Sequence, residues 1–316
     1  MSRAKYLAYR LLWAGLATGF VTVVLFLVAK AAPELAVEAA DAPRTDLPDV
    51  DNQFWDPEDP PHRQYAGWLS SLVTLDWGLS LRFGESITGL LAERGLITLA
   101  YLVPAVLLGT VLATVFGYVA AARQGGVTDG LIRGSSYVVL AVPNFVLGAA
   151  VVRYIRQHSF ELGASTYDLQ AGLLAEWNWL WLATAAAVLS VHVAATQLRQ
   201  VRAQSAEHLA ADFTTVLRAK GRGPLGIAYH VLRAAAVPLA SLFVAETVAL
   251  LTVSVFVIEA VLGIPGIGYV TWQAASVNDT PLVLIVTLLV AIAVVLASVA
   301  EDLLAVVLDP RLLDEE

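Results

Sequence analysis

The hydrophobic pattern of this chain consists of long apolar runs separated by short polar segments. A helix of about 20 apolar residues crosses the roughly 30 Å of hydrocarbon in a bilayer, so each long run predicts a membrane span. The first run follows a basic start and is longer than the apolar region of about 7 to 15 residues in a signal peptide. The pattern predicts an all-α membrane protein with six transmembrane helices and an uncleaved first helix. The runs occupy residues 11–29, 96–122, 131–152, 177–198, 238–258 and 281–308.

The polar segments divide the chain into four predicted parts. A stretch rich in Pro and Asp follows the first run without any periodicity, and from residue 64 aromatic, apolar and polar residues alternate over helical lengths. The core that follows contains a cytoplasmic loop at residues 199–237. The four parts are the N-terminus and first helix (1–32), an external acidic loop or cap with an interfacial helix (33–94), a five-helix core (95–308) and a cytoplasmic tail (309–316).

Composition and charge support this membrane topology. Apolar residues make up 58% of the 316 residues, above the share in soluble domains. Residues 33–94 hold twelve carboxylates and four arginines, a balance equal to the net charge of −8 of the whole chain. Twelve of the nineteen basic residues fall in segments predicted to be internal, which places both termini in the cytoplasm. We expect a multi-pass protein of the cytoplasmic membrane whose surroundings are the lipid bilayer, with no nucleic-acid partner.

The composition also limits the possible chemistry. The chain has no cysteine, and its five histidines are scattered without the spacing of metal ligands. We therefore expect no metal site.

The segment 209–239 carries charges that a lipid-facing helix would accept only at high cost, so it is predicted to be a cytoplasmic loop. Its first half has an apolar stripe at helical spacing, formed by Leu209, Phe213, Val216 and Leu217. Two glycines and a proline at residues 221–224 should end that helix. A second short helix is expected at about residues 225–236. Such a two-helix loop is suited to lie in a groove of another protein, although a basic connector without a docking partner has the same composition.

The loop resembles that of a known family. Arg-Ala-Lys-Gly at 218–221, His230, Leu-Arg at 232–233 and Pro238 resemble the cytoplasmic loop of the inner-membrane permeases of binding-protein-dependent ATP-binding-cassette (ABC) importers, most closely in the oligopeptide and dipeptide branch. The resemblance implies the type I ABC importer permease fold and a loop that receives the stroke of an ATPase subunit. The implied coupling-loop residues are Asp212, Phe213, Arg218, Ala219, Lys220, Gly221, His230, Arg233 and Pro238.

One departure from the wider importer class concerns the acidic contact to the ATPase. The class has Glu-Ala-Ala six residues before the loop glycine, where this chain has Thr215, Val216 and Leu217. An acidic contact at that place cannot be assumed, and Asp212 is the candidate substitute.

Further matches extend the resemblance over nearly the whole chain. They include a G-x-S-x-R/x-x-G-like turn, a proline-containing stretch at 141–148, an E-x-x-F-x-x-P-G-x-G-like stretch, Asp279 with Pro281, and a terminal Asp-Pro-Arg at 309–311. The first of these follows a helix that we interpret either as part of an external gate or as an interfacial helix anchored by Trp68 and Trp77. The turn residues are Gly78, Ser80, Arg82 and Gly84.

Several residues within the spans are candidates for the solute pathway. Pro143 should kink the third span, either beside a pathway or for packing alone. Glu246 is the one carboxylate expected deep in a span, where it either pins two helices or contacts solute. His192 is interpreted as a packed neutral imidazole rather than a proton sensor. The full set of pathway or gate candidates is Pro143, Asn144, Glu246, Glu259, Pro265, Gly266 and Gly268.

The resemblance implies a permease subunit that forms half of the translocation pore for a di- or oligopeptide. The expected partners are a second homologous permease, two ABC ATPase subunits and an extracellular lipid-anchored or periplasmic binding protein. Since the chain lacks a phosphate-binding G-x-x-x-x-G-K-[ST] motif, ATP and Mg would be bound by the ATPase partners, and this chain would not be an enzyme. The alternatives are an ion-gradient-driven transporter and a same-family importer of nickel chelates, glutathione or sugars.

Overall fold

The computed structural model describes residues 3–31, 59–158, 167–173 and 175–308. Within these ranges the chain is a bundle of helices, and its extended structure is limited to an isolated bridge between Leu79 and Ser86. Five helices are long and apolar enough to cross a membrane: Lys5–Ala31, Ile87–Ala122, Asn178–Ala210, Pro238–Leu262 and Thr280–Leu304. The helical class and the number of apolar spans predicted from the hydrophobic pattern are confirmed, with one span broken in two.

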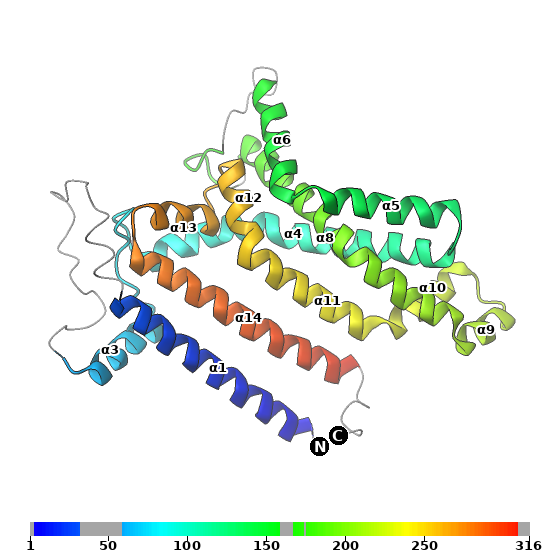
Figure 1. Cartoon of the computed structure of the whole chain (residues 1–316), viewed down its shortest axis with the longest axis horizontal. Helices are drawn as coiled ribbons and strands as arrows, with labels where there is room; N and C mark the ends of the chain where they lie inside the picture. The colour runs from blue at the N-terminus through cyan, green and yellow to red at the C-terminus, as the bar shows by residue number, and fades with distance from the viewer. Residues whose placement is uncertain (1–2, 32–58, 159–166, 174, 309–316) are drawn as a thin grey trace.

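The broken span is formed by α5 (Val127–Ala141) and α6 (Asn144–Gln157), which meet at an angle of 82°. The kink predicted at Pro143 within the span 131–152 is thus a full break between two helices. Val142 has the extended backbone angles φ −106° and ψ 117° that the residue before a proline prefers, and Pro143 has no N–H to continue the helix. Proline bends helices by this means, and here the chain turns almost at a right angle (Figure 1).

The centre of the bundle is the pair α4 (Ile87–Ala122) and α8 (Glu176–Ala210). The two helices approach closely at glycines of α4: a Cβ added at Gly109 would lie 2.6 Å from the Cβ of Val193, and one added at Gly117 would lie 2.8 Å from the Cβ of Val201. Small residues let helix backbones pack closely in membranes, where the hydrophobic effect between helices is absent. Both helices are longer than predicted, since α4 begins at residue 87 and α8 continues to residue 210.

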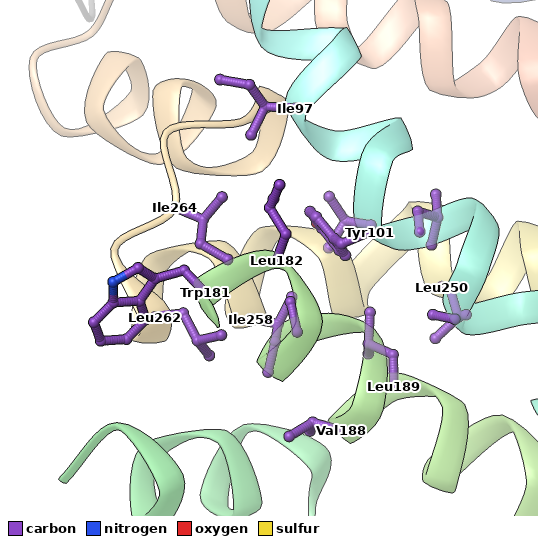
Figure 2. Close-up of a cluster of buried hydrophobic side chains, with 14 of the residues drawn as sticks. Ile97, Tyr101, Trp181, Leu182, Val188, Leu189, Leu250, Ile258, Leu262 and Ile264 are labelled. Atoms are coloured by element: carbon purple, nitrogen blue, oxygen red, sulfur yellow. The ribbon is translucent and has the colours of Figure 1, made fainter. Parts of the chain in front are cut away.

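A hydrophobic cluster fills the space between this pair and the next span (Figure 2). That span is made of α11 (Ala236–Ala249), a short π-helix η1 (Leu250–Ser254) and α12 (Val255–Leu262). The cluster joins all three elements to the central pair. Its labelled members are Ile97 and Tyr101 of α4, Trp181, Leu182, Val188 and Leu189 of α8, and Leu250, Ile258, Leu262 and Ile264.

A second layer is formed by α1 (Arg3–Ala31), which lies along α14 (Thr280–Leu308). Arg10 pairs with Asp302 at 2.6 Å near one end of the two helices. Near the other end, α3 (Pro61–Thr74) packs onto both. Trp68 of α3 is 1% exposed in this contact, so its ring is buried against α1 and α14 instead of projecting into a membrane interface.

The ends of the bundle differ. Figure 1 places the first turn of α1, the last turn of α14, and the short helices α9 (Asp212–Ala219) and α10 (Pro224–Ala234) toward one end. α3 and α13 (Ile267–Ser276) lie toward the other end. The acidic loop predicted after the first helix falls largely outside the described residues, as does the Asp-Pro-Arg at 309–311.

Candidate functional site

The two-helix loop begins where α8 ends at Ala210. Ala211 adopts extended angles, φ −71° and ψ 151°, and α9 then starts at Asp212. The expectation that Leu209 and Phe213 share one helix is therefore wrong, because the chain breaks between them. The break is held by Thr214, which is fully buried and donates a hydrogen bond of 2.8 Å from its hydroxyl to the carbonyl of His208. This hydroxyl fixes the direction in which α9 leaves α8.

The glycine at the end of α9 acts as a helix stop. Gly221 has φ +72°, and the N–H groups of Gly221 and Arg222 donate to the carbonyls of Arg218 and Leu217 at 2.9 and 3.1 Å. A left-handed residue after a helix closes its last turn in this manner, and glycine adopts that conformation without steric cost. The predicted stop signal is present, and α10 begins at Pro224, one residue before the predicted start.

An open groove of about 560 Å³ lies between α9 and α10, lined by Phe213, Val216, Leu217, His230, Arg233 and Ala234. The structure thus brings together three of the residues predicted for a coupling loop: Phe213, His230 and Arg233. Asp212, Arg218, Ala219, Lys220 and Gly221 are exposed around them, while Pro238 lies apart in the first turn of α11.

The residues that hold the loop in place were not predicted from the sequence. Ile227 and Val231 of α10 are 9% and 0% exposed, and α10 packs against α8. Their i, i+4 spacing was the available signal, since one apolar face of a short helix indicates what it packs against.

At the opposite end of the bundle, Glu259 of α12 is fully buried. Its Oε1 accepts hydrogen bonds of 2.7 Å from the hydroxyls of Thr98 and Tyr101, both on α4. Its Oε2 accepts one of 2.9 Å from the backbone N–H of Tyr269. The carboxylate therefore fastens α12, α4 and α13 to one another.

The glycines of the same motif allow this close packing. A Cβ at Gly266 would lie 2.5 Å from Thr98 Oγ1, and one at Gly268 would lie 2.6 Å from the Cα of Phe256. Gly263 takes φ +71° and ends α12, with Pro265 partly exposed in the turn that follows. Four predicted residues are thus brought together, but Glu259 has no exposed surface that would line a passage.

A second buried carboxylate joins two of the motifs. Asp279, which precedes α14, is fully buried and accepts hydrogen bonds from the Ser80 hydroxyl at 2.5 Å and the Arg82 N–H at 3.0 Å. Its other oxygen accepts the N–H of Leu282 at 3.3 Å, in the first turn of α14. Asn278, directly before Asp279, has φ +56°, a left-handed conformation that asparagine tolerates better than most residues.

The expectation that Glu246 is the one buried carboxylate is wrong. Asp129, Glu259 and Asp279 are at most 1% exposed, whereas Glu246 is only half-buried. The three buried groups lie at helix ends or beside turns, which hydropathy does not distinguish from exposed loops.

Asn144 begins α6 directly after the bend at Pro143 and is 9% exposed. Its side-chain amide donates a hydrogen bond of 3.1 Å to the hydroxyl of Ser254 in η1. One turn further on, a Cβ at Gly148 would lie 2.8 Å from Ile258 Cδ1, so α6 and α12 pack closely. The two irregular points of the spans, a proline break and a π-helix, are therefore in direct contact.

Comparison with known proteins identifies the class. Residues 113–314 match the family described as "Binding-protein-dependent transport system inner membrane component", and since the match covers more than half of the chain, the protein belongs to this family. It is an inner-membrane transport subunit, not an enzyme, and the family implies a substrate-binding partner and an ATPase partner. The family assignment favours a binding-protein-dependent importer over the ion-gradient-driven transporter considered from the sequence.

Individual relatives resemble the chain over most of its length. It is 26% identical over 312 residues to the "Dipeptide transport system permease protein DppB" of Bacillus subtilis, with 98% of each chain covered. It is 27% identical over 252 residues to the protein of that name from Lactococcus lactis subsp. cremoris, covering 79% of this chain and 80% of the relative. The "Metal-staphylopine import system permease protein CntB" of Staphylococcus aureus is 23% identical over 296 residues, with 93% and 92% covered.

Proposed function

We propose that this chain forms half of the translocation pore of an ATP-driven importer for di- or oligopeptides. The other half is a second homologous permease subunit, and a lipid-anchored or periplasmic binding protein delivers the solute. Two ABC ATPase subunits bind ATP and Mg and dock on α9 and α10. The observation that carries the proposal is the exposed groove between these helices, because it gathers predicted coupling residues at the end of a continuous 35-residue helix.

The structure supports this docking site in three ways. Phe213 and Val216, which are 37% and 50% exposed, line the groove together with Leu217, and a contiguous exposed apolar patch marks an interaction site. Basic side chains at Arg218 and Lys220 are exposed beside them. Asp212, exposed in the first turn of α9, is the proposed acidic contact to the ATPase. A di- or oligopeptide is the proposed solute class because two relatives that cover 98% and 92% of the chain are named for dipeptide and oligopeptide transport.

The proposed topology places both termini and the segment 199–237 in the cytoplasm, with α3 and α13 outside. α9, α10, the start of α1 and the end of α14 share one end of the bundle, as this topology requires. The cysteine-free sequence makes a direct test possible. A single cysteine at Lys220 should react with a membrane-impermeant maleimide in inside-out vesicles only, and reaction in intact cells would refute the topology.

The function is tested by a substitution at Gly221 in the complete complex. Gly221→Val places a β-branched side chain at φ +72°, which disfavours the native turn although no atom within 4 Å would obstruct it. We expect ATP-dependent dipeptide uptake into proteoliposomes to fall at least tenfold, with unchanged membrane insertion. Gly221→Asn is the matched control, because asparagine accepts left-handed angles, and it should retain most of the uptake.

The same assay tests the solute. Unlabelled peptides should compete with a labelled dipeptide and abolish its uptake. Nickel chelates, glutathione and sugars should leave its uptake unchanged. Uptake driven by an ion gradient without ATP, or competition by a chelate alone, would contradict the proposal.

A further inference from the structure

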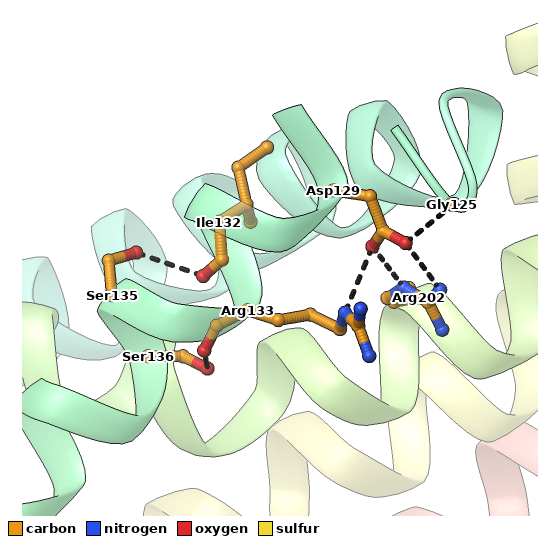
Figure 3. A network of polar contacts seen from close by, with 7 residues as sticks. All are labelled: Gly125, Asp129, Ile132, Arg133, Ser135, Ser136 and Arg202. Carbon is orange, nitrogen blue, oxygen red and sulfur yellow. Dashed lines mark hydrogen bonds and ion pairs between the residues drawn. The ribbon is translucent and has the colours of Figure 1, made fainter. Parts of the chain in front are cut away.

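A third buried carboxylate, Asp129, lies outside every motif discussed above. It is in the first turn of α5 and is 1% exposed. Arg202 of α8 binds it with two hydrogen bonds, Nε to Oδ1 at 2.7 Å and Nη2 to Oδ2 at 2.9 Å. The N–H of Gly125 donates to Oδ2 at 3.0 Å, and Arg133 Nε lies 3.3 Å from Oδ1 (Figure 3). Both oxygens are therefore fully engaged.

This contact between Asp129 and Arg202, called the clamp below, joins α5 to α8 through a buried carboxylate. Asp129 and Ser136 are the two buried residues of α5, and the Ser136 hydroxyl is used within this helix, where it donates to the carbonyl of Arg133. Apolar side chains such as Leu131 and Val138 are each 69% exposed. The contacts of α5 thus combine one charged pair with the partly buried apolar side chains of Ile132, Val139 and Leu140.

Arg202 lies close to the coupling loop. α8 runs without a break to Ala210, and at 1.5 Å per residue Arg202 is about 12 Å from that end. Thr214 of α9 is hydrogen-bonded to the carbonyl of His208 in the last turn of α8. A displacement of α9 therefore reaches Arg202 through one rigid helix.

Asp129, in turn, is connected to the bend. α5 runs from the clamp to Ala141, directly before the 82° break. After the break, Asn144 is hydrogen-bonded to Ser254 in η1, and π-helical turns within α-helices occur frequently at functional sites. The clamp thus lies between the coupling loop and the contact that Asn144 makes with Ser254 of η1.

We propose that the Asp129–Arg202 pair is the positioning contact that transmits movement of α9 and α10 to α5 and to the bend at Pro143. The inference rests on the proposed function. The Asp129 side chain is buried and that of Arg202 is 18% exposed. Because such an ion pair contributes little net stability compared with apolar residues of similar volume, we attribute its presence to the geometry it fixes. The bidentate Arg–carboxylate arrangement fixes both distance and orientation, which a lysine cannot do.

The test measures coupling, expressed as ATP hydrolysed per solute imported by the complete complex in proteoliposomes. We expect Asp129→Asn and Arg202→Lys each to raise this ratio at least fivefold, with the amount of assembled complex unchanged. Arg199→Lys, an exposed arginine three residues earlier on α8, is the matched control and should stay within twofold of wild type. A purely structural role predicts that hydrolysis and import fall together at a constant ratio, and that result would overturn the inference.

A second measurement leaves the clamp intact and so does not depend on how the variants fold. Because the chain has no cysteine, spin labels can be attached at Val138→Cys on α5, Gln200→Cys on α8 and Leu296→Cys on α14, all at exposed positions. On vanadate trapping of the ATPases, the distance from 138 to 200 should change by less than about 2 Å, since the clamp holds the two helices together. The distance from 138 to 296 should change by more.

Movement of α5 relative to α8 as large as that relative to α14 would overturn the proposed transmission. If the wild-type complex shows no ATP-dependent uptake at all, the proposed function fails. If it transports normally and the variants keep the wild-type ratio, only the role of the clamp fails.

Discussion

Removing the buried carboxylate of Glu259 should strongly destabilise the bundle. Glu259→Ala would leave three donors without an acceptor: the hydroxyls of Thr98 and Tyr101 and the N–H of Tyr269. Each unsatisfied buried donor costs about 1 to 3 kcal/mol. The Thr98 hydroxyl can turn to the carbonyl of Arg94, already 3.3 Å away, so two donors remain orphaned. The expected loss in the free energy of unfolding is roughly 2 to 6 kcal/mol.

Glu259→Gln removes one of the two acceptor oxygens, whereas Glu259→Ala removes both. The amide oxygen can still accept from Thr98 and Tyr101, but the NH₂ group would face the N–H of Tyr269, donor against donor. Both the N–H of Tyr269 and the new NH₂ group then lack an acceptor, and at about 1 to 3 kcal/mol for each unsatisfied donor the loss is roughly 2 to 6 kcal/mol. Both variants should therefore be clearly less stable than wild type.

The assay is unfolding of the purified protein in mixed micelles by increasing SDS, followed by tryptophan fluorescence. Trp181, in the hydrophobic cluster next to Ile258 and Leu262, reports on the same region (Figure 2). Glu85→Gln makes the same chemical change at an exposed position and should alter the free energy by less than about 0.5 kcal/mol. An alanine variant at 259 that unfolds at the same SDS fraction as this control would refute the hydrogen-bond reasoning.

The same unfolding measurement tests two further contacts. Gly109→Ala should lower stability by about 1 to 3 kcal/mol, because its Cβ would lie 2.6 Å from the Cβ of Val193. Gly134→Ala, in open space on α5, should instead be neutral or stabilise by up to about 1 kcal/mol, and equal effects would contradict the packing argument. Ser80→Ala should cost about 1 to 3 kcal/mol by leaving an oxygen of buried Asp279 with one donor fewer, and wild-type stability would show that this bond is dispensable.

Features with local signals were predictable from the sequence. Hydropathy over about 20 residues located the spans, and Gly221 with Pro224 marked the stop and start of the two short helices, because backbone angles are a local property. The break at Pro143 was predicted in place, but its 82° angle was not. The angle depends on how α6 packs against α12, through Gly148 and Ile258, and periodicity contains no information on that contact.

The carboxylate sites were predicted poorly because their partners are distant in sequence. Glu259 and Thr98 are 161 positions apart, Asp279 and Ser80 199, and Asp129 and Arg202 73. A single sequence shows each acid beside a turn or a helix end, where exposure is the usual outcome. Glu246 attracted attention instead because it lies within an apolar run. In a folded bundle, burial is decided by which element covers a position.

The distribution of these carboxylates limits where the bundle can move. Glu259 joins α12, α4 and α13, and Asp279 joins the turn before α4 to the start of α14, so this end is held as one unit by buried bonds. The loop end is held differently: α9 and α10 expose much of their surface, and α5 is held by the Asp129 clamp together with partly buried apolar side chains. Between the two ends, the backbone of the spans is irregular at the bend at Pro143 and at η1, and these two points contact each other. A force applied at the loop therefore meets a rigid far end, and the break and the π-helix are the points at which the spans can bend without loss of buried carboxylate bonds.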